Sequence, residues 1–292
     1  MHSIRIFFFA ARPKTLWAGI APVLIGTAMA VDAGGFHWPS ALVCFVVALT
    51  VQIGTNFAND YFDFIKGTDT SERIGPTRVT QAGLIAPAVM RNAFVLAFAV
   101  CFVASLYLGH RAGWWVLVLG VVSIASGILY TAGPLPLGYI GLGDAFAFVF
   151  FGPVATGATH YVQTLRVDSN AVVAGLAPGF FAVAMITVNN LRDVAGDRRS
   201  GKRTPAVLFG PQFAKFEYLF SILLACLIPV VLHLRTGDHL YVIACALIIV
   251  PAIPSIRTVF LQGNGPLLNN VLAATGRMLL LYAIIFVIGW LL

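Results

Sequence analysis

The stretch Asn56-Phe57-Ala58-Asn59-Asp60-Tyr61-Phe62-Asp63 decides the fold, because an apolar segment long enough to span a membrane ends in it. That segment covers residues 38–58, and amides and carboxylates follow it at once. At about 100° per residue, Asn56, Asn59, Asp60 and Asp63 fall within an arc of about 100° on a helix. We therefore expect this helix to present one acidic face at the edge of a lipid bilayer.

A second apolar segment, residues 171–190, ends in the same way, in the stretch Asn189-Asn190-Leu191-Arg192-Asp193-Val194-Ala195-Gly196-Asp197. Its amides and carboxylates also share one helical arc. Carboxylates gathered from two helices at a bilayer edge repel one another, and desolvation disfavours their charged forms. A cation must then lie between them, and Mg²⁺ suits oxygen donors that leave positions open for substrate phosphates. Helix caps and an intramembrane ion path are the alternative interpretations.

The composition is that of a membrane protein. Hydrophobic residues make up 59% of the 292 residues and charged residues 10%, and the mean hydropathy is +0.91. These values exclude a soluble α/β domain and predict an all-α polytopic membrane helix bundle. The chain reads as one domain, residues 1–292, with two motif-bearing halves, about 1–140 and 141–292. Nine transmembrane segments are predicted: 16–31, 38–58, 88–108, 114–131, 141–160, 171–190, 218–234, 240–258 and 270–291.

The basic residues predict the orientation. With the N-terminus in the cytoplasm, only Arg111, Arg166 and Arg235 lie on the far side, and Arg277 lies within the last segment. The other 14 of the 18 Lys and Arg residues then face the cytoplasm, as the positive-inside rule requires. We expect a cytoplasmic (inner) membrane protein with both acidic faces in the cytoplasm and the C-terminus on the opposite side. This topology and an anionic substrate account for the net charge of +7, so no nucleic-acid partner is predicted.

Polar loops are expected after both acidic segments, at residues 59–87 and 189–217, and each continues into a basic stretch. The negative charges of four aspartates are balanced by two Mg²⁺ ions. The negative charge of a bound diphosphate must then be neutralised by lysine and arginine side chains. A diphosphate above an apolar bundle implies a lipid diphosphate. The charged residues that follow the two clusters are Lys66, Asp69, Arg73 and Arg78, and then Arg198, Arg199, Lys202 and Arg203.

These residues resemble the motifs of the UbiA superfamily of intramembrane aromatic prenyltransferases, and of its naphthoate branch in particular. The resemblance covers nearly the whole chain. The matching stretches are N-x-x-N-D-Y-x-D-x-x-x-G-x-D (56–69), R-I-G-P-x-R (73–78), N-N-x-R-D-x-x-x-D-R-x-x-G-K-x-T (189–204), the linker segments 130–134 and 138–144, and the start 11–15. One departure is Gly67, where many members have an aspartate; it leaves the role of Asp69 open.

The resemblance implies a nine-helix bundle in which catalytic aspartates carry Mg²⁺ to a prenyl diphosphate. It implies metal binding by Asn59, Asp60, Asp63, Asp193 and Asp197. The acceptor pocket is expected near Arg12, Tyr139, Asn190 and Arg192. The remaining expected substrate contacts come from Asn56, Lys66, Asp69, Arg73, Arg78, Asn189, Arg198 and Lys202.

The implied reaction is transfer of a polyprenyl group to 1,4-dihydroxy-2-naphthoate with loss of CO₂, a step of menaquinone biosynthesis. A related transferase acting on 4-hydroxybenzoate or homogentisate is the nearest alternative. A secondary transporter is the alternative from another class, and it would place its charged sites near the bilayer midplane. Prenyl chain length, oligomeric state and the identity of any general base do not follow from the sequence.

Overall fold

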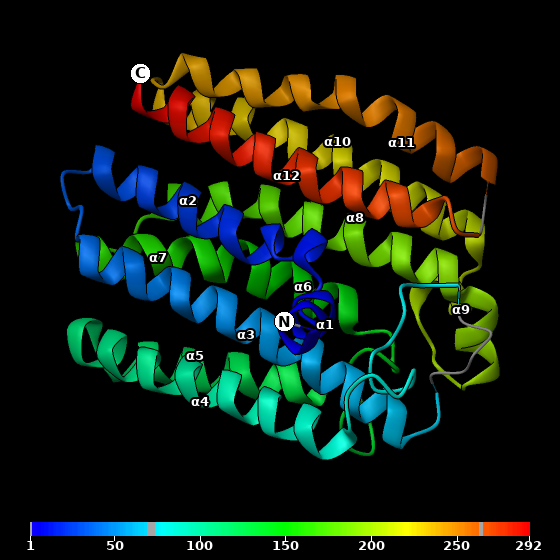
Figure 1. Ribbon diagram of the computed structural model, residues 1–292. Coiled ribbons are helices and arrows are strands. Elements are labelled where there is room, and N and C mark those ends of the chain that lie inside the picture. Colours follow the sequence, from blue (N-terminus) through cyan, green and yellow to red (C-terminus); the bar gives the residue numbers. More distant parts are fainter. Residues whose placement is uncertain (1, 69–73, 263–264) are drawn as a thin grey trace.

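The computed structural model describes residues 2–68, 74–262 and 265–292, and every regular element in these ranges is a helix. The long helices lie side by side along one direction, with the connecting loops at the two ends of the bundle (Figure 1). The predicted all-α bundle is therefore confirmed.

Each of the nine predicted segments contains a helix or a continuous run of helices. They are α2 (Trp17–Asp32), α3 (Trp38–Ile65), α4 (Pro87–Ala112), α5 (Trp114–Leu129), α6 (Gly143–Val149) joined through the π-helical turn η2 (Phe150–Val154) to α7 (Ala155–Thr164), α8 (Ser169–Arg199), α10 (Pro211–Thr236), the 3₁₀ helix η3 (Leu240–Ile248) joined to α11 (Ile249–Gln262), and α12 (Leu268–Leu291). Three shorter helices complete the described chain: α1 (His2–Ala10), η1 (Pro13–Thr15) and α9 (Pro205–Leu208).

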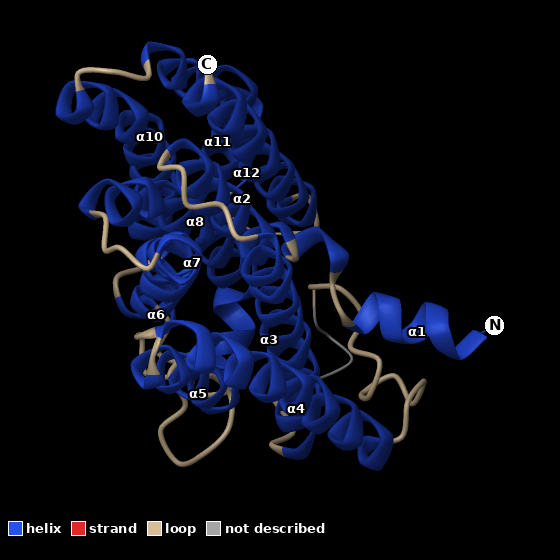
Figure 2. Ribbon diagram, turned by 90° about the vertical axis from the view of Figure 1, so that its left-hand side faces the viewer, coloured by secondary structure: helices blue, strands red, loops and turns tan. Residues whose placement is uncertain are grey.

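The count of nine spans is approximate. Seven helices of the described chain are long and apolar enough to cross a membrane. By contrast, α2 and α5 have 16 residues each, which corresponds to about 24 Å of helix against a hydrocarbon core of about 30 Å. The segment before α2 extends it, at a bend of 58°. Figure 2 shows α1 projecting away from the bundle at this bend.

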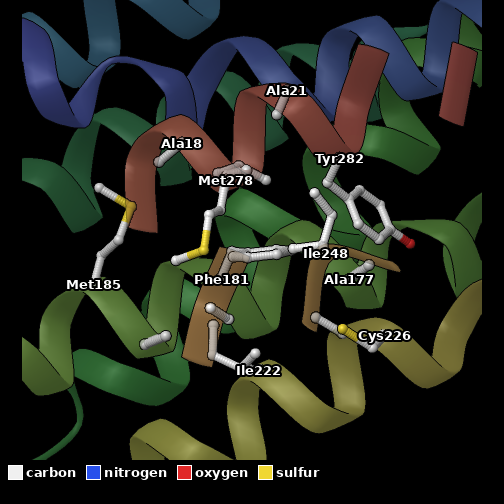
Figure 3. Packing of buried hydrophobic residues seen from close by; sticks show 14 of the residues in the cluster. Ala18, Ala21, Ala177, Phe181, Met185, Ile222, Cys226, Ile248, Met278 and Tyr282 are labelled. Carbon is white, nitrogen blue, oxygen red and sulfur yellow. The ribbon is translucent and has the colours of Figure 1, made fainter. Parts of the chain in front are cut away.

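Helix α8 is the centre of the largest core cluster. Phe181 of α8 and Tyr282 of α12 are fully buried, and their ring centroids lie 5.6 Å apart in an edge-to-face arrangement. Met278 lies next to Phe181, and Met185 belongs to the same cluster one turn further along α8 (Figure 3). Because lipid is as apolar as these side chains, close packing rather than exclusion of water holds the helices together. A rigidly packed α8 therefore carries the second acidic cluster at its end.

Two glycines bring α8 against the α6–α7 run. A Cβ atom on Gly175 would lie 2.7 Å from the carbonyl oxygen of Gly152, and one on Gly179 would lie 2.7 Å from that of Phe148. Only glycine allows such an approach, and the four-residue spacing is the usual pattern of close helix contact in membranes. The opposing run bends at Gly152, whose backbone is not helical, just before Pro153.

Candidate active site

Both acid-bearing helices run further than their apolar parts and end in the same capping motif. In α3, Gly67 has φ +67°, its N–H donates to the carbonyl of Phe64, and the N–H of Thr68 donates to that of Asp63. This is a Schellman motif. The expected loops at 59–87 and 189–217 therefore begin later than predicted, because the acidic stretches belong to the last turns of the helices. Glycine at position 67 supplies the left-handed conformation that this ending requires.

Helix α8 repeats this ending. Gly201 has φ +75°, its N–H donates to the carbonyl of Arg198, and the N–H of Lys202 donates to that of Asp197. Asp63 and Asp197 thus hold equivalent positions in the two motifs. The repeat that the sequence indicated is a repeat of helix endings, and it places Lys202 directly beside the second acidic cluster.

Lys202 brings the two acidic helix ends together. Its Nζ lies 3.6 Å from Asp63 Oδ1 on α3 and 4.0 Å from Asp197 Oδ1 on α8. A single cationic group therefore contacts carboxylates that are 134 positions apart in the numbering. This is the convergence that the two sequence clusters predicted.

Asp63 is bonded to side chains from two other segments of the chain. It accepts from the guanidinium of Arg78 (2.8 Å) and from the hydroxyl of Tyr139 (2.7 Å). The ring of Tyr139 lies close to two lysines, with Lys66 Nζ 5.0 Å and Lys202 Nζ 4.5 Å from its centroid. Such stacking holds ammonium groups over an aromatic face. Tyr139 thereby orders one acidic and two basic side chains at once.

Arg192 fixes the orientation of Asp193. Its Nε and Nη2 donate to the two oxygens of the neighbouring carboxylate at 2.9 and 2.6 Å, and its Nη1 donates to Asn269 Oδ1 at 2.7 Å. The guanidinium is buried, with only 1% of the side chain exposed. A bidentate pair of this kind sets both the position and the plane of a carboxylate.

Lys66 binds backbone rather than facing the site. Its Nζ donates to the carbonyls of Thr131 (2.6 Å) and Gly133 (3.2 Å). Partial burial lowers the pKa of this ammonium, Asp63 opposes that shift, and nearby Lys202 adds to it. Lys66 therefore holds the α5–α6 loop against the end of α3.

A polar cavity of about 130 Å³ lies between the two helix ends. Predicted and unpredicted residues share its lining. The predicted ones are Arg12, Asn59, Asp63, Arg78, Tyr139, Asn189, Asn190, Arg192, Asp193, Asp197 and Lys202. The lining residues that were not predicted as site residues are Thr15, Pro76, Tyr130, Thr131, Gly138, Thr204 and Leu272. All of these except Leu272 lie in the stretches that match the superfamily.

A larger and mainly apolar cavity of about 290 Å³ adjoins the polar one. Along α3 its lining runs from Asn59 back to Cys44, which corresponds to about 22 Å of helix. Five side chains line both cavities and mark the boundary between them: Arg12, Thr15, Asn59, Tyr130 and Asn189.

Tyr130 is a boundary residue that was not among the predicted site residues. Burial raises the pKa of its phenol, and the carboxylates of Asp144, Asp197 and Asp63 raise it further. The hydroxyl therefore stays protonated and is available as a hydrogen-bond donor. The sequence did contain one indication of its importance, because Tyr130 lies in the linker segment 130–134, which matches a motif of the superfamily.

Some predicted site residues lie elsewhere. Asn56 donates to the carbonyl of Ala11 and lines the apolar cavity. Arg198 is exposed and outside both linings. Asp60 accepts from the backbone N–H groups of Val79 and Thr80 and is absent from both linings. Asp69 and Arg73 lie outside the described residues.

The donors around the polar cavity are of the type that Mg²⁺ prefers: the carboxylates of Asp63, Asp193 and Asp197 and the amides of Asn59 and Asn189. Within the described residues, no three Asp, Glu, His or Cys side chains lie close enough to hold one ion. Cationic side chains contact the carboxylates in this arrangement. The donor set thus fits magnesium in kind.

Known proteins are similar to this chain in sequence and in fold. A model of the UbiA prenyltransferase family matches residues 19–266. The 1,4-dihydroxy-2-naphthoate octaprenyltransferase of Mycobacterium tuberculosis is 36% identical over 284 residues, 97% of this chain and 96% of that protein. The Escherichia coli enzyme of that name is 34% identical over 289 residues, 95% and 92% of the two chains. A UbiA homolog from Archaeoglobus fulgidus, solved with GPP and Mg²⁺, shares the fold at TM-score 0.69 and 14% identity, covering 98% and 99% of the two chains.

Proposed function

Because the chain belongs to the UbiA prenyltransferase family, we propose that it transfers a polyprenyl group from a prenyl diphosphate to 1,4-dihydroxy-2-naphthoate with release of CO₂. The named activity of relatives that match nearly the whole chain supports this assignment. The observation that carries it is the pair of adjoining cavities, one polar and one apolar, with five shared lining residues. A lipid diphosphate has the same division into a charged head and an apolar tail.

Magnesium is the proposed cofactor. A UbiA homolog with the same fold was solved bound to GPP and Mg²⁺, which supports this choice. Asn59 and Asp63 on α3, with Asp193 and Asp197 on α8, would hold it, and we propose two ions because the site is rich in carboxylates. When bound, magnesium stabilises the charge that develops on the departing diphosphate.

The cationic side chains of the polar cavity would bind the diphosphate. Arg78 and Lys202 already lie in its lining beside Asp63, and Arg12 lies at the boundary with the apolar cavity. Their positive charges complement the phosphate oxygens. The breaking C–O bond would lie at this boundary, where the protonated phenol of Tyr130 can donate to the departing oxygen. Apolar walls beyond the boundary exclude water from the allylic cation.

The reaction balances without an added oxidant or reductant. The C–O bond of the donor breaks and its electron pair leaves with diphosphate. The ring carbon that bears the carboxylate of the naphthoate attacks the allylic carbon, and the C–C bond to that carboxylate then breaks. Its electron pair restores the aromatic ring as CO₂ departs, giving demethylmenaquinol. We propose that Arg12, Tyr139, Asn190 and Arg192 surround the acceptor, since all four line the polar cavity.

We place the protein in the cytoplasmic (inner) membrane with the site facing the cytoplasm. The positive-inside count supports this orientation, and both acidic helix ends lie at the same end of the bundle, to the right in Figure 1. That position at one end also argues against a transporter with charged sites at the midplane.

Purified membranes would be incubated with the naphthoate, Mg²⁺ and prenyl diphosphates of several lengths. We expect a prenylated quinone by mass spectrometry, together with one CO₂ for each prenyl group transferred. EDTA should stop the reaction, and excess Mg²⁺ should restore it. The proposal would be wrong if the naphthoate were recovered unchanged while 4-hydroxybenzoate or homogentisate was prenylated.

A further inference from the structure

Asp60 shares a motif with Asn59 and Asp63 but faces a different part of the protein. Its Oδ1 accepts from the N–H of Thr80 at 3.0 Å, and its Oδ2 accepts from the N–H of Val79 at 3.2 Å. Only 3% of the residue is exposed. Both carboxylate oxygens are thus bonded to main-chain groups about 20 positions further along the chain.

These two N–H groups belong to a segment that we call the strap, residues 74–86. The strap folds on itself, since the N–H of Ala82 donates to the carbonyl of Arg78 and that of Leu84 to the carbonyl of Val79. Val79 and Ile85 are buried in a core cluster with residues of α3 and α4. The strap is therefore a built element of the fold.

The strap delivers Arg78 to the polar cavity. Arg78 immediately precedes the two residues that Asp60 binds, and its Nη2 donates to Asp63 at 2.8 Å. It is 7% exposed, and it lines the polar cavity together with Pro76. Two carboxylates of α3, one turn apart, therefore hold the strap by different means: Asp63 binds the Arg78 side chain, and Asp60 binds the backbone just beyond it.

The strap is also tied to α12. Asn269 Nδ2 donates to the carbonyl of Ile74 at 3.3 Å, and the oxygen of the same amide accepts from Arg192, the residue that clamps Asp193. The strap is thus linked, at its first residue and at its middle, to helices that carry, or support, the acidic clusters.

We propose that Asp60 is a positioning residue that anchors the strap so that Arg78 enters the site, and that Asp60 does not ligate magnesium. Asp60 lines neither cavity, so ligation would require its carboxylate to turn away from the strap. That would leave buried backbone N–H groups unsatisfied, which is costly. The proposal rests on the proposed function only through the role of Arg78 toward the diphosphate. It replaces our expectation from the sequence that Asp60 is a metal ligand.

The first test compares Asp60→Asn with Asp63→Asn, which makes the same chemical change on the same helix. An asparagine oxygen can keep one of the two backbone bonds, so Asp60→Asn should raise the KM for prenyl diphosphate on the order of tenfold. The Mg²⁺ concentration for half activation should stay within about twofold of the wild type. Asp63→Asn should raise that concentration about tenfold or more. An equal rise in both variants would make Asp60 a ligand and overturn the proposal.

The second test asks whether Asp60 acts through Arg78. In an Arg78→Ala background, Asp60→Asn should change the KM for prenyl diphosphate by less than about twofold, because the positioned group is already absent. If the two effects multiply instead, the anchor does not work through Arg78.

The third test needs neither a variant nor catalysis. Hydrogen exchange at the amides of Val79 and Thr80 in the wild-type protein would be followed with and without Mg²⁺. Exchange should be slow and unchanged by the metal. An increase of about tenfold on adding Mg²⁺ would show that Asp60 leaves the strap for the ion, and would overturn the proposal. Failure of prenyl transfer alone would contradict the proposed function but leave this result standing.

Discussion

The replacement Lys202→Met probes the contact that joins the two acidic helices. Lys202 Nζ is within 4.0 Å of both Asp63 and Asp197, and 18% of its side chain is exposed. Methionine keeps the length and removes the charge. A charge-assisted contact to a phosphate oxygen contributes about 1.5–3 kcal/mol. At about 1.4 kcal/mol per tenfold, the KM for prenyl diphosphate should rise by about 10- to 150-fold, while folding is little affected at this partly exposed position.

Initial rates would be measured in purified membranes at saturating naphthoate and Mg²⁺, with the prenyl diphosphate concentration varied. Lys202→Arg should recover much of the loss, because it keeps the charge. Lys215→Met is the matched control, since Lys215 lines neither cavity and its Nζ donates to the carbonyl of Phe260; its KM should stay within about twofold of wild type. A normal KM in Lys202→Met, or a rise in the KM for the naphthoate alone, would refute the reasoning.

Three further changes test other parts of the site. Asp193→Asn should lower kcat by about 100-fold or more and raise the Mg²⁺ requirement, because it removes a carboxylate that Arg192 orients; an unchanged Mg²⁺ titration would contradict this role. Tyr139→Phe removes the hydroxyl bonded to Asp63 and keeps the ring close to the two lysines, so kcat/KM should fall about tenfold, while the free energy of unfolding should fall by no more than about 1.5 kcal/mol. Ser123→Phe fills part of the apolar cavity, so turnover of long prenyl diphosphates should fall more than that of geranyl diphosphate; equal losses would exclude this cavity as the tail site.

The bundle and the convergence of its acidic ends were predictable from local patterns. Apolar runs of membrane-spanning length give the helices, and the helical spacing of Asn59 with Asp63, or Asn189 with Asp193, gives the acidic faces. Membrane topology then requires both faces to lie on the same side. Gly67 and Gly201 also marked where the two helices end, a capping signal that the prediction of loops starting at residues 59 and 189 did not use.

The partners of Asp60 and Lys66 were not predictable in this way. Asp60 binds backbone N–H groups of the strap, and Lys66 binds backbone carbonyls of the α5–α6 loop. Every residue except proline carries the same backbone N–H group, and every residue carries the same backbone C=O group. The sequence therefore contains no pattern that distinguishes these contacts from contacts to metal or phosphate. An aspartate that binds an amide and one that binds an ion look alike until the chain is folded.

Tyr130 and Thr15 were missed for a related reason. Both lie at the boundary of the two cavities, on segments far apart in the chain. Neither residue type marks chemistry by itself, since hydroxyl groups are common at helix ends. Their importance comes from which cavities they border, and that depends on the packing of α2, α3 and α8.

The most direct test is a structure of the protein with Mn²⁺ in place of Mg²⁺ and a bound prenyl diphosphate, with the metal located by its anomalous scattering. We predict metal within about 2.1 Å of carboxylate oxygens, with α3 and α8 both supplying ligands and the diphosphate bridging them, and no metal at Asp60. Metal bound by one helix alone, or a diphosphate outside the polar cavity, would contradict the account.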